Sequence, residues 1–164
     1  MCFSSVPTRN RVIVLILLQQ ANVIICNGRA CLADYGMASL VTDSTFSMKP
    51  AMGIEGVEWW KAPEVLEDQI LEGVSADVFA FAMLVVEVLT GQVPFAEIPQ
   101  HKVLLDILDG RRPSKPAEVE ERMWDLIQSC WNQDPDSRPK IGKVVEKLKE
   151  LVNSPGKCAI PRGY

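Results

Sequence analysis

The sequence predicts a mainly α-helical fold that carries one small β-hairpin. Two short apolar runs joined by Asn27-Gly28 predict the hairpin, because Asn-Gly readily adopts the positive φ angles of a type I′ turn. Further on, apolar patterns with a helical period are separated by breaks that contain proline, glycine or aspartate. They predict helices at residues 76–90, 100–108, 118–131 and 141–152.

The composition is that of one soluble globular domain. The chain has 164 residues, of which 48% are hydrophobic and 23% are charged. This length can bury a sizeable core without disulfide bonds. The net charge of -4 argues against a surface that binds nucleic acid.

The cysteines point to a reducing compartment, and we expect a cytoplasmic protein. They are odd in number and scattered, with no C-x-x-C pair, and His101 is the single histidine. Neither a disulfide framework nor a zinc site is expected from this pattern. The five are Cys2, Cys26, Cys31, Cys130 and Cys158.

An apolar run at residues 12–18, preceded by Arg9 and Arg11, resembles the core of a signal peptide only weakly. No small-residue cleavage site follows it, and a membrane span needs roughly 20 apolar residues. We therefore expect a buried strand or helix here and no association with a membrane.

The segment at residues 35–57 loses all periodicity and is rich in hydroxyl side chains. Compact domains rarely carry a structureless loop longer than about 15 residues unless it has a function. The chain then becomes helical. Pro63 suits the first position of a short helix that ends at Leu66.

The next helix should be the buried axis of the domain, because it is apolar on nearly all sides. Ser75 is expected to cap its start, and Gly91 to end it. The chain as a whole divides into an atypical N-terminal segment at 1–20, a domain at 21–152 and a flexible tail at 153–164.

Four motifs in a fixed order carry a family resemblance. They are Asp34-Tyr35-Gly36, Ala62-Pro63-Glu64, Ser75-Ala76-Asp77-Val78, and Cys130-Trp131 followed by Asp134-Pro135 and Arg138-Pro139. In this order they resemble the second half of a protein kinase domain of the tyrosine-kinase-like Ser/Thr branch, with Tyr35 in place of the Phe of D-F-G. The resemblance implies the C-terminal lobe of the α+β kinase fold, without the N-terminal lobe.

The resemblance also implies a site for Mg²⁺ and ATP. Asn22 aligns with the catalytic-loop Asn and Asp34 with the Asp of D-F-G, and both offer the oxygen ligands that Mg²⁺ requires when it bridges ATP phosphates. From the residues alone, Asn22 could equally be a turn residue at the start of a strand. Asp34 could be an ordinary loop carboxylate.

Three further residues acquire structural roles from the resemblance. Glu64 and Arg138 resemble the buried ion pair that ties the activation segment to the helical core. Asp77 resembles the carboxylate that accepts backbone N–H bonds from the catalytic loop, although it could equally be a favourable first-turn Asp.

Loop hydroxyls are candidate phosphorylation sites that would order the loop by pairing with arginine, although most such hydroxyls are simply solvated. They are Ser39, Thr42, Ser44, Thr45 and Ser47.

The sequence departs from the family pattern at the catalytic-loop positions. Leu17 stands at the position of the proton-accepting Asp, and Gln19 at that of the catalytic-loop Lys. A leucine cannot accept the proton of a substrate hydroxyl. The 164 residues also contain no G-x-G-x-x-G loop and no V-A-I-K lysine. Catalysis by this chain alone is therefore not expected.

Two functions remain open. One is a truncated protein kinase domain, whose family activity is Mg-ATP-dependent phosphoryl transfer to protein Ser/Thr. The alternative is a pseudokinase-like scaffold or protein-interaction module. Either would act on protein partners or substrates, with no nucleic acid, membrane or metal cluster. The abrupt start of the match near Asn22 could reflect a native, spliced or misannotated N-terminus.

Overall fold

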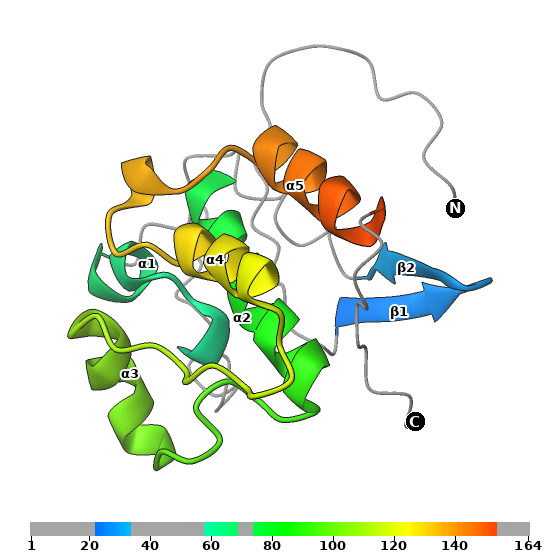
Figure 1. Cartoon of the computed structure of the whole chain (residues 1–164). Coiled ribbons are helices and arrows are strands. Elements are labelled where there is room, and N and C mark those ends of the chain that lie inside the picture. Colours follow the sequence, from blue (N-terminus) through cyan, green and yellow to red (C-terminus); the bar gives the residue numbers. More distant parts are fainter. Residues whose placement is uncertain (1–21, 34–57, 69–73, 154–164) are drawn as a thin grey trace, which may run out of the picture.

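The computed structural model describes residues 22–33, 58–68 and 74–153, so the expected loop, N-terminal segment and tail lie outside the described residues (Figure 1). As predicted, the described chain is mainly helical with one small antiparallel sheet. Its elements are β1 (Val23–Cys26), β2 (Arg29–Leu32), the 3-10 turn η3 (Glu58–Trp60), α1 (Pro63–Asp68), α2 (Val74–Thr90), α3 (Gln100–Leu108), α4 (Glu121–Cys130), the 3-10 turn η4 (Pro135–Ser137) and α5 (Ile141–Asn153).

Strands β1 and β2 form the predicted hairpin, with Cys26 opposite Arg29 at the turn. Asn27 and Gly28 adopt φ angles of 52° and 72°, as a type I′ turn requires. The Ala33 N–H donates to the Asn22 carbonyl at 2.7 Å, which closes the open end of the hairpin. The predicted hairpin and its turn are confirmed.

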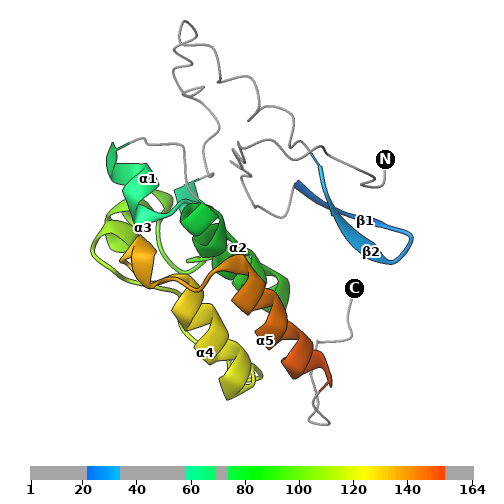
Figure 2. The same ribbon diagram turned by 90° about the horizontal axis from the view of Figure 1, so that it is seen from above.

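Helix α2 is the predicted buried axis. Phe79, Ala82 and Met83 are completely buried, and only positions near its two ends, such as Val74 and Val88, are exposed. Helix α4 packs against α2, and α5 packs against α4 in turn (Figure 2). Turn η3 also packs against α2, so the residues that follow the long loop are fixed on the same central helix.

Helix boundaries differ from the predictions at a few positions. Helix α2 begins at Val74, so Ser75 lies in its first turn and the predicted cap is wrong. The Ser75 carbonyl instead accepts a hydrogen bond from Arg138 at 3.0 Å. Serine is common both at caps and in first turns, so the sequence did not distinguish the two positions. Helix α4 starts at Glu121 rather than 118, because a turn closed by the Val119 N–H and the Pro116 carbonyl precedes it.

Candidate functional site

The two residues expected to bind Mg²⁺ belong to the hairpin. Asn22 is half-buried immediately before β1, and its carbonyl accepts the hydrogen bond from the Ala33 N–H. Ala33 directly precedes Asp34, so the hairpin holds the chain that leads into Asp34 beside Asn22. Asp34 itself lies outside the described residues, as do Leu17 and the five candidate phosphorylation sites.

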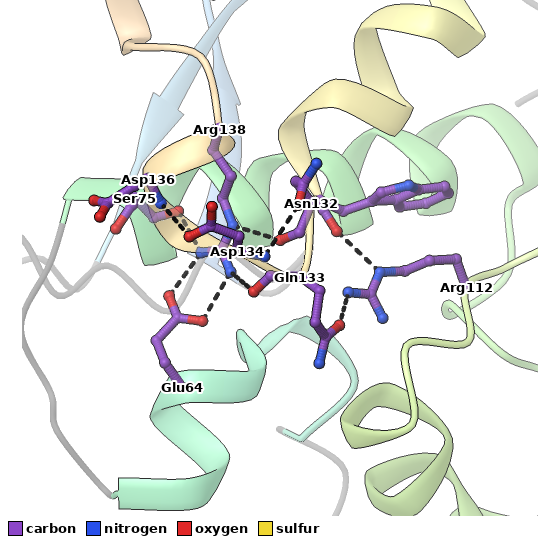
Figure 3. Close-up of polar contacts among 9 residues, drawn as sticks. Glu64, Ser75, Arg112, Asn132, Gln133, Asp134, Asp136 and Arg138 are labelled. Carbon is purple, nitrogen blue, oxygen red and sulfur yellow. Dashed lines mark hydrogen bonds and ion pairs between the residues drawn. The ribbon is translucent and has the colours of Figure 1, made fainter.

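Glu64 and Arg138, predicted to pair, lie in direct contact. The two guanidinium Nη atoms reach the two carboxylate oxygens at 2.6 and 2.8 Å, which is a bidentate ion pair (Figure 3). The Arg138 side chain is 0% exposed and that of Glu64 is 29% exposed. The planar guanidinium suits such paired contacts better than a lysine ammonium does.

Arg138 also binds three backbone carbonyls. Its Nε donates to Asn132 at 2.8 Å, and its two Nη atoms donate to Ser75 at 3.0 Å and Gln133 at 3.4 Å. Together with the Glu64 contacts, these bonds give every N–H of the guanidinium an acceptor. We call this set (Glu64, Arg138 and the three carbonyls) the anchor. It stabilises a buried charge because no donor is left unpaired.

The loop that carries Arg138 is ordered by local hydrogen bonds. The Asp134 carboxylate accepts from the Ser137 hydroxyl at 2.7 Å and from the Asp136 N–H at 3.1 Å, and so caps η4. These bonds, the one from Ser137 foremost, lower the pKa of Asp134 below its ordinary value of 3.8. The capped turn presents Arg138 toward Glu64.

Arg112 is a second arginine beside the anchor, and the sequence analysis missed it. Its guanidinium lies over the Phe79 ring at 4.9 Å from the centroid, while that of Arg138 lies over the same ring at 5.1 Å. Partial burial, followed by the charge of Arg138, lowers the pKa of Arg112 to about 10, and Glu64 opposes this shift. In the sequence, Arg112 stands beside Arg111 and before Pro113. That pattern indicated a break between two helices, and it did not indicate that Arg112 is partly buried.

Glu87 is a buried carboxylate in the last turn of α2 that sequence reasoning also missed. It accepts a hydrogen bond from the Trp60 indole Nε1 at 3.0 Å, and both residues are buried. Trp60 belongs to η3, which directly follows the long loop. This bond therefore fixes η3 to the last turn of α2, whereas the anchor contacts the first turn of the same helix at Ser75.

Asp77 lies half-buried in the first turn of α2, on the same helix as Ser75 and Phe79. Its position suits either of the roles considered for it, since the described residues do not include those before Asn22. Among the described residues, no group of three or more His, Cys, Asp or Glu side chains could hold a metal ion. In the same part of the chain, none of the helices combines the length and apolarity needed to cross a bilayer.

The contacts of Trp60, Glu64 and Arg138 hold the residues that follow the long segment in place. The residues around Trp60 and Glu64 are bonded to α2 and to the loop before α5. Residues 34–57 run between this fixed point and the hairpin. The described contacts therefore lie at the C-terminal end of that segment in the sequence.

Comparison with known proteins gives one family. A family model described as protein tyrosine and serine/threonine kinase matches residues 14–148. The chain is 32% identical over 125 residues to the serine/threonine-protein kinase STY17 of Arabidopsis thaliana, covering 76% of this chain and 21% of that protein. It is 34% identical over 136 residues to the human tyrosine-protein kinase Srms, covering 82% of this chain and 27% of that protein. The chain thus spans about a quarter of the length of these relatives or less.

Proposed function

Because the chain belongs to the protein tyrosine and serine/threonine kinase family, we propose that residues 21–152 form the helical C-terminal lobe of a protein kinase domain. Residues 1–20 would be an atypical preceding segment and 153–164 a tail. The bidentate pair of Glu64 with Arg138 carries this proposal. It joins two of the kinase-like motifs in the way that the resemblance implies, across 74 residues of sequence.

In this proposal the segment from Asp34 to Glu64 is the activation segment, and Asn22 and Asp34 are the metal ligands. An amide and a carboxylate oxygen fit Mg²⁺, which prefers hard oxygen ligands. The hydrogen bond between Ala33 and Asn22 supports the assignment, because it brings the two ends of the hairpin together. Bound Mg²⁺ would bridge and neutralise the ATP phosphates.

The family activity is transfer of a phosphoryl group from ATP to a protein hydroxyl, and this polypeptide alone is proposed not to perform it. The aliphatic Leu17 cannot take the proton of the attacking hydroxyl. A lysine that clamps the phosphates and a glycine-rich cover would have to come from outside these 164 residues. Serine and threonine are the proposed acceptors, on the branch resemblance and the likeness to STY17.

A pseudokinase-like scaffold is the second candidate function. The combination of a fully bonded anchor with a leucine at the position of the base favours it. The helical surface would then bind protein partners, and phosphorylation of the hydroxyls within 39–47 would regulate the segment. The free thiols of Cys26, Cys31 and Cys130 support placement in a reducing compartment such as the cytoplasm.

Nucleotide binding separates the two candidates. A fluorescent ATP analogue would be titrated into the 164-residue chain with and without Mg²⁺, and into Asn22→Ala and Asp34→Ala variants. Binding that requires Mg²⁺ and is lost in both variants supports the proposed ligands. No binding at all favours the scaffold. Mg²⁺-dependent binding that both variants retain contradicts the assignment of Asn22 and Asp34.

A further inference from the structure

Two guanidinium groups share one aromatic ring, and one of them is paired with a carboxylate. Arg112 and Arg138 both lie within about 5 Å of the Phe79 centroid, a distance typical of cation–π contacts. Arg138 has Glu64 as its ion-pair partner. Among the described residues, Arg112 has no carboxylate in contact and donates only to neutral oxygens.

The hydrogen bonds of Arg112 join the ends of two helices. Its Nε donates to the Trp131 carbonyl at 3.0 Å, just past α4, and one Nη donates to the Ile107 carbonyl at 3.2 Å, in the last turn of α3. The other Nη donates to the Gln133 side chain at 2.5 Å. Neither helix has a basic residue in its own last turn, so Arg112 supplies the positive charge that both C-termini favour.

The two arginines hold the same short piece of chain. The carbonyls of residues 131, 132 and 133 are consecutive, and Arg112 binds the first while Arg138 binds the other two (Figure 3). Movement of this piece would therefore shift the position from which Arg138 reaches Glu64. After burial, the charge of Arg138 lowers the pKa of Arg112 and that of Glu64 raises it, so Glu64 offsets part of the repulsion between the two arginines.

We propose that Glu64 is the counter-ion of both guanidinium groups, and that Arg112 is a second positioning residue of the anchor although it does not touch Glu64. The inference rests on the proposed function, because it concerns the support of a proposed activation segment. It implies that the end of α3 and the end of that segment are coupled through residues 131–133 and Phe79.

A double-mutant cycle tests the shared counter-ion. The thermal unfolding of the 164-residue chain would be measured for Glu64→Gln, Arg112→Met and the double variant. In the Arg112→Met background, Glu64→Gln removes the counter-ion of one guanidinium group instead of two. The melting temperature of the double variant should therefore fall by less than the sum of the two single decreases, with a difference of about 3 °C or more. Additive decreases would contradict the proposal.

Lys115→Met provides the matched control. Lys115 is a cation that pairs with Glu121 at the surface, so its substitution should be additive with Glu64→Gln. If Arg112→Met does not fold, Arg112→Lys replaces it. This variant keeps the charge, so Glu64→Gln should lower the melting temperature by as much in its background as in the wild type. A clearly smaller decrease would overturn the shared counter-ion.

Hydrogen exchange tests the positioning role separately. The amides of Val65 and Leu66 bond to the Ala62 carbonyl at the start of α1, which Arg112 does not touch. Either Arg112 variant should speed their exchange several-fold relative to α5 amides, and Lys115→Met should not. Unchanged exchange at both amides would overturn the positioning role. These measurements need no nucleotide. A negative result would therefore argue against the role of Arg112, whereas a wrong kinase proposal would show in the nucleotide titration.

Discussion

Arg138 and Glu64 lie 74 residues apart in the sequence and meet through two nitrogen–oxygen contacts of 2.6 and 2.8 Å. The contact links the start of α1 to the turn that precedes α5. Because the arginine is completely buried, the pair is also a point at which the fold is sensitive to substitution.

Arg138→Ala should destabilise the fold strongly. Removing one partner of a buried ion pair typically costs about 3–5 kcal/mol, because the other charge is left uncompensated. For a chain of this length, that corresponds to a decrease in melting temperature of about 6–20 °C. Lys143→Ala is the control, since the pair of Lys143 with Glu146 is exposed and contributes about 1 kcal/mol or less. Equal melting temperatures for the wild type and Arg138→Ala would show that the buried pair is not formed.

Trp60→Phe should loosen the end of the proposed activation segment. The substitution removes the indole donor of the 3.0 Å bond to the buried Glu87 carboxylate. Loss of a partner from a buried polar group costs about 1–3 kcal/mol, which urea unfolding can measure. The neighbouring Trp59→Phe serves as the control, because Trp59 is only half-buried and should cost less. A larger loss of stability for Trp59→Phe than for Trp60→Phe would argue against a supporting role for the bond between Trp60 and Glu87.

The hairpin and α3 could be predicted almost to the residue, because their signals are local. Asn27-Gly28 encodes its own turn, and Pro99 and Gly110 bracket α3 on either side. Arg112 and Glu87 could not be recognised, since their partners lie on other elements that only the fold brings near. A buried carboxylate in an apolar helix looks, in sequence, like a residue that merely interrupts the pattern.

Cys130 should be almost unreactive in the native protein. Burial is the main cause that raises the pKa of its thiol to about 11, so the reactive thiolate is scarce at neutral pH. In a Cys2→Ser, Cys158→Ser background, a disulfide reagent should modify the exposed Cys26 and Cys31 at least about 100-fold faster than Cys130. Rapid loss of all three thiols without denaturant would contradict the burial of Cys130.

Asp134 should stabilise the turn before Arg138 only while it is ionised. Its folded pKa lies below 3.8, so its contribution is present above that pH and is lost as the pH falls through the folded pKa. The wild type should therefore exceed Asp134→Asn in urea midpoint at pH 7, and the difference should shrink as the pH approaches 3. A difference in urea midpoint that grows on acidification would contradict a stabilising role for the ionised Asp134 carboxylate.

Phosphoryl transfer by the purified 164-residue chain tests the central claim most directly. The chain would be incubated with labelled Mg-ATP and a generic protein substrate, beside an Asp34→Ala variant and an active kinase as the positive control. Since Leu17 cannot act as a base, we expect incorporation no higher than that of the Asp34→Ala variant. Robust incorporation by the wild-type chain, abolished in Asp34→Ala, would show that these residues catalyse the reaction unaided and would contradict the account.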